Sequence, residues 1–279
     1  MHMTHTDFPI NVTHYMNTIH DLLKIGRDFL LKQLGSGIVE VQKGSRDFAL
    51  NTDIELEKIY SDHLLTAYPH IPIMGEELSP DAISGDNTGM FWAIDPIDGT
   101  ANYARSISIY GSSIALIKNG KPIASGICFP SLNETYIAGE GMGAYLNEKR
   151  IYVSDIDTLS SAILTYGDFA VGNNREARNM VRYQYIEAIG HQVQRVRMLG
   201  SAALHLAWVA AGRADVSVTL SNNAWDVQGG VLLVREAGGL VYDVDGSEHT
   251  IHSQFTFASN RHIKNEVLKI AAEIENSLK

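Results

Sequence analysis

The sequence predicts a layered fold of mixed α and β structure with a partly antiparallel sheet. Segments with apolar residues at helical spacing alternate along the chain with short apolar runs typical of strands. One Asn-Gly pair, Asn119-Gly120, lies between two strand-like runs, which is a strong hairpin signal. About 45% of the residues are apolar and 19% are charged, a mixture that excludes a disordered chain and a membrane protein.

The first half of the chain predicts two helices followed by strands. Apolar residues recur at helical spacing from Val12 and predict a helix that ends near Gly35. A second helix is expected after Thr52, where Thr52 and Glu55 fit a capping box. Apolar runs then predict strands over 71–74, 91–94, 107–117, 122–129 and 135–138.

The second half predicts further strands, each next to a helix. Strands are expected over 162–166, 214–220 and 240–244. Helices are expected over 175–190, 201–211, 225–237 and 261–278. Gly212 and Gly238 follow two of these helices, where a glycine suits the left-handed conformation that closes a helix.

Length and composition limit the architecture and the partners. The 279 residues contain no linker or repeat, so we expect one domain over 1–279, with a metal- and phosphate-binding subregion over about 1–150 and a substrate-side subregion over 151–279. The net charge of −10 argues against nucleic acid as a partner. No apolar run is long enough to span a membrane, and residues 1–11 lack a secretory leader. The single cysteine, Cys128, excludes an internal disulfide. A cytoplasmic protein is expected.

Acidic residues follow apolar segments at several places. Glu76 follows a predicted strand, Asp95 and Asp98 follow another, and Asp53 and Asp226 lie at helix starts. A buried carboxylate is costly unless it is compensated, and several carboxylates that converge would repel one another. Hard divalent cations are the usual compensation, and Mg²⁺ prefers oxygen ligands. The pattern therefore indicates a Mg²⁺ site.

The segment from Asp95 to Thr100 carries most of this information. Pro96 restricts the backbone and predicts a turn, which lets Asp95 and Asp98 face one cation together with the Ile97 carbonyl. A helix can begin at Gly99-Thr100, where free amide groups bind phosphate oxygens. Alone, Asp95 and Asp98 could equally be turn residues.

Three motifs together resemble the inositol monophosphatase family. They are Gly-Glu-Glu at 75–77, Trp-Ala-Ile-Asp-Pro-Ile-Asp-Gly-Thr-Ala-Asn-Tyr at 92–103, and Trp-Asp-Val-Gln-Gly-Gly at 225–230 with Glu-Ala-Gly-Gly at 236–239. The resemblance runs from about Asp21 to Asn260. It implies an α/β (α+β) fold arranged as an α-β-α-β-α sandwich, a homodimer, and a lithium-sensitive sugar phosphatase that uses two to three Mg²⁺ ions.

The resemblance also implies ligands for these ions, residue by residue. Glu76, Asp95 and the Ile97 carbonyl match the ligands of a first ion. Asp95, Asp98 and Asp226 match those of a second ion, with Asp95 bridging the two. Glu76 also matches the anchor of a third, weaker ion. Read without the resemblance, Asp226 could be only a helix N-cap.

The remaining roles concern the attacking water and the substrate. Thr100, supported by Asp53 or Glu76, matches the group that orients the water. The amides of Gly99 and Thr100 match phosphate contacts, and Asp98, Asp226 and the backbone of Ala202, within the segment 200–203, match contacts on the substrate side. Glu77 matches a supporting glutamate. Without the resemblance, Asp53 and Thr100 could simply belong to helix starts, and Arg195 and Arg197 could be a solvated strand face or a substrate-binding pair.

Two positions depart from the family pattern. Leu50 stands where the family usually carries threonine, three residues before Asp53, so the network that orients the water is expected to be modified. Thr219 stands where inositol-specific members carry a glutamate, six residues before Trp225. The loss of that carboxylate predicts a weaker preference for inositol.

These observations predict a Mg²⁺-dependent phosphomonoesterase acting on inositol 1-phosphate or a similar small polyol or sugar phosphate. The same chemistry on histidinol phosphate, fructose 1,6-bisphosphate or a 3′-phosphorylated nucleotide is an alternative. A catalytically inactive, metal-binding regulatory subunit is an alternative from another class. Glu76, Asp95, Asp98, Thr100 and Asp226 are all present, which favours an enzyme.

Overall fold

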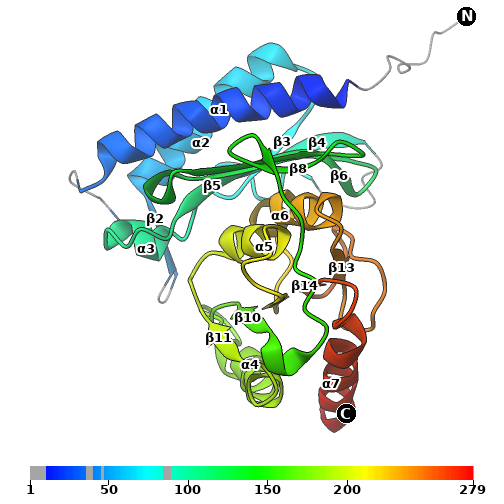
Figure 1. The fold of residues 1–279 in the computed structure, drawn as a ribbon. Helices are drawn as coiled ribbons and strands as arrows, with labels where there is room; N and C mark the ends of the chain where they lie inside the picture. Colours follow the sequence, from blue (N-terminus) through cyan, green and yellow to red (C-terminus); the bar gives the residue numbers. More distant parts are fainter. Residues whose placement is uncertain (1–10, 36–39, 45–46, 84–88, 279) are drawn as a thin grey trace, which may run out of the picture.

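The computed structural model describes residues 11–35, 40–44, 47–83 and 89–278. Its layers follow one another as helices, sheet, helices, sheet and helices, as Figure 1 shows from top to bottom. This order confirms the predicted α-β-α-β-α sandwich. The absence of a leader was predicted for residues 1–11, of which only Asn11 is described. No helix among the described residues combines the length and the apolar character that crossing a bilayer requires.

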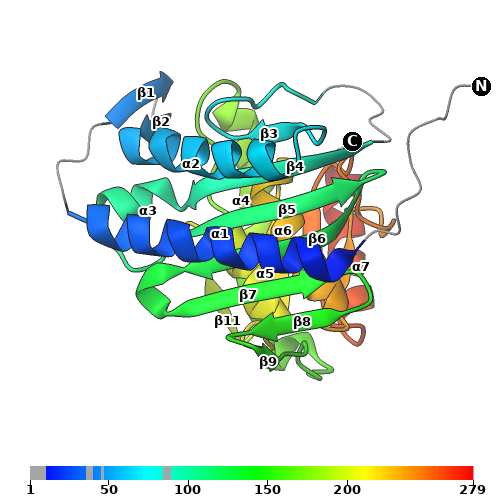
Figure 2. The ribbon, with the colours of Figure 1, turned by 90° about the horizontal axis from the view of Figure 1, so that it is seen from above.

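The larger sheet has seven strands in the order β3-β4-β5-β6-β7-β8-β9. Strand β3 runs parallel to β4, and the other neighbours are antiparallel. Their bounds are β3 Ile73–Gly75, β4 Met90–Asp98, β5 Gly111–Lys118, β6 Lys121–Phe129, β7 Glu134–Gly139, β8 Gly143–Leu146 and β9 Lys149–Arg150. Helices α1 (Val12–Gln33) and α2 (Asn51–Ala67) cover its outer face, as Figure 2 shows from above. Residues of α1, α2 and this sheet form one apolar cluster that includes Leu23, Tyr60 and Trp92.

The predicted hairpin between β5 and β6 is confirmed. Lys118 pairs with Lys121, and the two residues between them, Asn119 and Gly120, have φ angles of 50° and 74°. Two consecutive positive φ angles are typical of the type I′ turn, whose twist matches that of the flanking strands.

The second sheet has five strands in the order β11-β10-β12-β14-β13. Their bounds are β10 Ile163–Tyr166, β11 Arg195–Arg197, β12 Val216–Thr219, β13 Leu240–Tyr242 and β14 Thr256–Ser259. Helices α5 (Ala202–Ala210) and α6 (Ala224–Glu236) lie between the two sheets (Figure 1). Helices α4 (Arg175–Gly190) and α7 (Lys264–Ser277) cover the far side. One apolar cluster surrounds α5 and α6 and reaches both sheets, and another lies between the second sheet and the helices α4 and α7.

Several short elements were not predicted from the sequence. They are the hairpin β1 (Glu40–Gly44) and β2 (Asp47–Leu50), strand β8 and the edge strand β9, strand β14, the 3₁₀ turns at Pro130–Leu132 and Leu159–Ser161, and the extent of α3 (Thr100–Ala104). Each has five residues or fewer, too short to show a hydrophobic period. The division of the chain near residue 150 stays a prediction.

Two local predictions were wrong. The capping box of Thr52 and Glu55 does not form, because α2 begins at Asn51, two residues earlier than predicted, with Leu50 as its N-cap. There the Leu50 amide donates to Asp53 Oδ2 at 2.9 Å. Pro96 does not end its strand, since β4 continues to Asp98 and its pairing with β5 shifts register between Asp95 and Asp98. A bulge of this kind tolerates proline and redirects neighbouring side chains.

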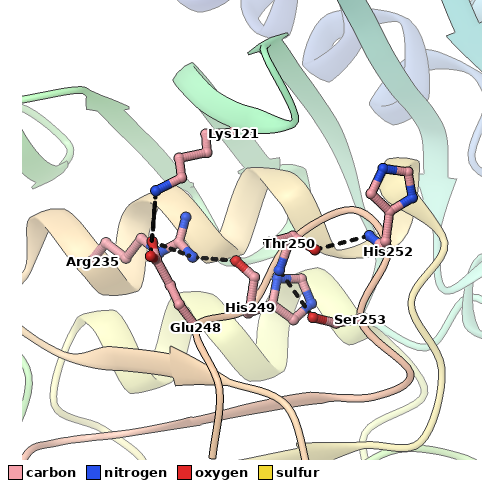
Figure 3. A network of polar contacts seen from close by, with 7 residues as sticks. All are labelled: Lys121, Arg235, Glu248, His249, Thr250, His252 and Ser253. Atoms are coloured by element: carbon pink, nitrogen blue, oxygen red, sulfur yellow. Dashed lines mark hydrogen bonds and ion pairs between the residues drawn. The ribbon is translucent and has the colours of Figure 1, made fainter. Parts of the chain in front are cut away.

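A polar network at the end of α6 ties three segments together (Figure 3). Glu248, in the loop between β13 and β14, accepts a hydrogen bond from Lys121 of β6 at 3.1 Å and lies 3.5 Å from Arg235 of α6. Arg235 also donates to the His249 carbonyl at 2.6 Å. The nearby lysine lowers the pKa of Glu248. These contacts join the two sheets to the C-terminal end of α6, which is the end opposite to Asp226.

Candidate active site

Three of the predicted metal ligands meet at one place. Each of Glu76, Asp95 and Asp226 offers a carboxylate oxygen within 4.8 Å of the others. The parallel pairing of β3 with β4 brings the first two together, because Gly75 pairs with Ile94 and the Glu76 amide donates to the Ile94 carbonyl at 3.2 Å. Asp226 comes from the first turn of α6, which packs against β4. We call Glu76, Asp95 and Asp226 the carboxylate corner.

Asp95 is the most deeply buried member of the carboxylate corner. It is 1% exposed, and its Oδ1 atom has no hydrogen-bond partner among the described residues. Burial, followed by the nearby carboxylates of Glu76, Asp98 and Asp226, raises the pKa of Asp95 well above its ordinary value. An ionised carboxylate in this position is strongly destabilised unless a cation joins it.

Asp98 lies close to the carboxylate corner, but its oxygens face the start of α5. Oδ2 accepts hydrogen bonds from the Ser201 hydroxyl and from the Ala203 amide at 2.8 Å, and Oδ1 accepts one from the Ala202 amide at 3.1 Å. Burial raises the pKa of Asp98 to about 6, although these hydrogen bonds act in the opposite direction. Asp98 therefore links the bulge of β4 to α5, the segment predicted to contact the substrate.

Thr100 and Asp53 lie beside the bulge. The Thr100 hydroxyl is 2.9 Å from the Ile97 carbonyl and 3.4 Å from Asp53 Oδ1. Asp53 is fully buried, and its other oxygen accepts the Leu50 amide. Leu50 thus contributes a backbone donor to this network. The predicted association of Asp53 with Thr100 is present in the geometry, and the role of the pair stays a proposal.

Gly99 has to be glycine for two reasons. Its φ angle is +88°, in the left-handed region, and a Cβ atom there would lie 3.0 Å from the Ile109 carbonyl and 3.1 Å from the Gly200 carbonyl. A side chain would therefore push apart the backbones that converge between Asp98 and Thr100.

The simpler interpretation, in which Asp226 is only the N-cap of α6, is wrong. The N-cap is Asn223, and Asp226 lies three residues into the segment, where Asn223 Nδ2 donates to its Oδ2 at 3.0 Å. Arg195 and Arg197 lie exposed on β11, and each donates to the carbonyl of its preceding residue. They are not among the residues gathered at the carboxylate corner.

Glu57 is a residue that the sequence analysis missed. It is fully buried, and its carboxylate accepts the amides of Glu77 at 2.7 Å and Leu78 at 2.9 Å. It thereby holds the loop that carries Glu76. A Cβ atom on Gly75 would lie 2.0 Å from Glu57 Oε1, which explains the glycine before Glu76. The available signal was an acidic residue one helical turn after Asp53, between the apolar Leu56 and Tyr60.

Arg182 was also missed, on the substrate side. It is 8% exposed and donates to the carbonyls of Asp168 at 3.1 Å, Arg178 at 3.2 Å and Leu220 at 2.8 Å. It therefore fixes the segments that follow β10 and β12. These segments, Thr219 and the residues 200–202 line one hollow of about 460 Å³, which we call the substrate-side hollow.

The residues of the carboxylate corner fit a hard divalent cation. Their donor atoms are all oxygens, as Mg²⁺ prefers, and nitrogen or sulfur donors typical of zinc do not occur in the group. The unpartnered Asp95 Oδ1 and the mutual repulsion of three carboxylates are the features that a cation would relieve.

A carboxylate corner of this kind, on an α-β-α-β-α sandwich, is typical of a phosphoric monoester hydrolase. The family model described as the inositol monophosphatase family matches residues 13–277. The protein therefore belongs to the inositol monophosphatase family, whose members are phosphoric monoester hydrolases and are generally metal-dependent.

Relatives and solved structures agree with this assignment. A Nus factor SuhB of Xylella fastidiosa is 40% identical over 208 residues, which cover 75% of this chain and 73% of the relative. A fructose-1,6-bisphosphatase/inositol-1-monophosphatase of Thermotoga maritima is 34% identical over 253 residues, covering 91% and 93%. A solved Thermotoga maritima IMPase superposes with a TM-score of 0.83 at 32% identity, covering 95% of this chain and 100% of that chain.

Proposed function

We propose that this protein is a Mg²⁺-dependent phosphomonoesterase that hydrolyses inositol 1-phosphate or a similar small polyol or sugar phosphate. The observation that carries the proposal is the convergence of Glu76, Asp95 and Asp226 around a buried carboxylate oxygen without a partner. Asp98 and the Ile97 carbonyl complete the proposed ligand set for two to three ions. When bound, such ions lower the pKa of a water and neutralise charge on the reacting phosphate.

The chain's own residues position the water and the phosphate. Thr100 orients the attacking water, and the buried Asp53 beside its hydroxyl holds the threonine in place. The Gly99 and Thr100 amides contact the phosphate. Charge that develops on the phosphate oxygens is stabilised by fixed dipoles of this kind, because they need no reorganisation during the reaction.

The substrate-side residues bind the alcohol part of the ester. Asp98 orders the start of α5 through three hydrogen bonds, which places the backbone of Ala202 at the edge of the substrate-side hollow. Asp226 completes this side, and Thr219 lies in the wall of the hollow. No side chain has to form a covalent bond with phosphorus, since a positioned water is sufficient.

Fructose 1,6-bisphosphate is the second candidate substrate, because the Thermotoga maritima relative carries both activities in its name. Histidinol phosphate and 3′-phosphorylated nucleotides have no comparable support. An inactive regulatory subunit is disfavoured because Glu76, Asp95 and Asp226 are gathered with the geometry of a site. A cytoplasmic location, a homodimer and lithium sensitivity stay predictions from the sequence.

A phosphate-release assay over a panel of phosphomonoesters tests the proposal. The panel contains inositol 1-phosphate, fructose 1,6-bisphosphate, histidinol phosphate and a 3′-phosphorylated nucleotide, each with Mg²⁺ and with excess chelator. We expect Mg²⁺-dependent turnover that is highest for the polyol and sugar phosphates. Full turnover in chelator would contradict the metal assignment, and no turnover of any ester would support the regulatory subunit.

A further inference from the structure

The substrate-side hollow lacks a substrate-facing group at position 219. Thr219 is 4% exposed, and its hydroxyl is buried without a hydrogen-bond partner among the described residues. It lies against the backbone of Gly167, where an added Cβ atom would be 3.4 Å from Thr219 Cα. A side chain covered in this way offers little to a substrate hydroxyl. The group that selects the alcohol must therefore come from another position.

Asp168 provides the carboxylate of the substrate-side hollow. Among the described residues that line the hollow, Asp168 is the only acidic one, and it is exposed. It follows β10 by two residues, and β10 runs parallel to β12, the strand of Thr219, so both strands end at the same edge of the sheet. This edge is where ligands bind in sheets with parallel strands.

The Asp168 carboxylate also lies beside the segment that Asp98 orders. A Cβ atom added to Gly200 would be 3.4 Å from Asp168 Oδ2. Gly200 directly precedes Ser201 and Ala202, which both donate to Asp98. The Asp168 carboxylate thus lies beside the segment proposed to bind the alcohol, and Gly200 in turn lies against Gly99 of the proposed phosphate-binding segment.

The position of Asp168 is fixed without using its carboxylate. Arg182 donates to the backbone carbonyl of Asp168, and its other donors reach the carbonyls of Arg178 and Leu220. Among the described residues no side-chain hydrogen bond or ion pair involves the Asp168 carboxylate. Both of its oxygens are therefore available to accept hydrogen bonds from a ligand.

We infer that Asp168 is the residue with which this enzyme selects a hydroxylated alcohol, replacing the carboxylate that is missing at position 219. The inference rests on the proposed phosphatase function. Two carboxylate oxygens can accept hydrogen bonds from adjacent hydroxyl groups of a polyol or sugar. Such charge-assisted hydrogen bonds give an advantage of roughly tenfold to a hundredfold over an alcohol without hydroxyl groups.

A matched pair of esters tests the inference. Inositol 1-phosphate and cyclohexyl phosphate present the same six-membered ring with and without hydroxyl groups. The kcat/KM of each is measured with saturating Mg²⁺ for the wild type, Asp168→Asn, Asp168→Glu and a surface control, Asp157→Asn. We expect Asp168→Asn to lower kcat/KM for inositol 1-phosphate by roughly tenfold, mainly through KM, and to leave cyclohexyl phosphate unchanged.

The variants separate a specificity role from a structural one. Asp168→Glu keeps the charge and should retain more of the preference than Asp168→Asn, and Asp157→Asn should behave as the wild type. An unchanged preference in Asp168→Asn, or equal losses on both esters, would overturn the inference while leaving the phosphatase proposal intact. If the wild type cleaves neither ester, the inference fails, and if it also cleaves no ester of the phosphate-release panel, the proposed function fails with it.

Discussion

The carboxylate corner and the substrate-side hollow differ in how their polar groups are compensated. In the corner, the side chains of Glu76, Asp95 and Asp226 are brought together, and the buried Asp95 Oδ1 has no hydrogen-bond partner among the described residues. In the hollow, the buried Arg182 donates its hydrogen bonds to backbone carbonyls. The acidic residue among the described lining residues, Asp168, is exposed. The corner therefore has the features that a bound cation would relieve, whereas the contacts of Arg182 in the hollow are satisfied by backbone atoms.

Because of this difference, one region can change without loss of the reaction and the other cannot. A substitution in the carboxylate corner alters the charge that holds the ions, so it should affect every substrate alike. The walls of the hollow are held by the backbone contacts of Arg182, so side chains such as Thr219 and Asp168 can vary while the walls stay in place. Substitutions there should change only which alcohol is preferred.

The largest effect is expected for Asp95→Asn. The amide removes charge at the residue proposed to bridge two ions, so kcat/KM should fall by about a thousandfold or more on every ester. Glu77→Gln is the matched control, because Glu77 is adjacent to the corner without belonging to it. The measurement is phosphate release by both variants after circular dichroism has shown that they are folded. Equal losses would mean that the ligand roles are misassigned.

Glu57→Gln should have the next largest effect. Glu57 accepts two amides of the loop that carries Glu76, and the amide side chain can accept only one of them well. The dissociation constant for Mg²⁺ should rise by roughly ten- to a hundredfold, while kcat at saturating Mg²⁺ changes little. Titration of activity against Mg²⁺ measures both. An unchanged Mg²⁺ requirement would show that Glu57 is only a structural contact.

The raised pKa values of the carboxyl groups predict how the stability of the folded protein, with and without Mg²⁺, depends on pH. Burial raises the pKa of Asp98 from 3.8 to about 6 and raises that of Asp95 as well. Each raised pKa means that the folded, metal-free protein holds a proton more tightly than the unfolded chain. Its free energy of unfolding should therefore fall as the pH rises from about 4 through about 6, as Asp98 ionises, and the ionisation of Asp95 should lower it further.

Thermal unfolding with Mg²⁺ and with chelator checks this dependence. Well above pH 6, where Asp98 is ionised, Mg²⁺ should raise the Tm by several degrees. Near pH 4.5 protons compete for the same oxygens, and the increase should be much smaller. The same increase at both pH values would contradict the assignment of Asp95 and Asp98 as groups whose charge the ions relieve.

The smallest effect is expected for Thr219→Val. The substitution replaces a buried hydroxyl that has no partner among the described residues by a methyl group of similar size. The free energy of unfolding should rise or stay within about 1 kcal/mol, and kcat/KM for inositol 1-phosphate should change by less than about threefold. Chemical denaturation and the phosphate-release assay measure these quantities. A loss of tenfold or more on inositol 1-phosphate would return the specificity role to Thr219.

The sequence predicted the layers and the carboxylate corner because both leave local signals. Long amphipathic helices such as α1 show their period directly, and Asp95, Asp98 and Asp226 lie in motifs that resemble one family. The sequence analysis did not predict the roles of Glu57 and Arg182, because their hydrogen-bond partners are backbone atoms of distant segments. Such contacts depend on which loops the fold brings together, and no pattern along the chain records them.

The short strands and the bulge were not predicted from the sequence for a different reason. Strands such as β8 and β9 are too brief to show an alternation, and they form because β8 pairs with the edge of β7 and β9 pairs with β8. The bulge at Pro96 likewise depends on the register with β5. Proline alone indicates a break in regular pairing, and only the neighbouring strand decides whether that break is a turn or a bulge.

The most direct test of the account is the rate of phosphate release from inositol 1-phosphate by metal-free protein as Mg²⁺ is returned, with Asp95→Asn alongside. The account predicts no turnover by the metal-free wild type and a rate that rises to saturation with Mg²⁺. It predicts no comparable rise for the variant at any Mg²⁺ concentration. Full turnover by the metal-free wild type would contradict the claim that the carboxylate corner holds the catalytic ions. An Asp95→Asn variant whose rate rises with Mg²⁺ as the wild-type rate does would contradict it as well.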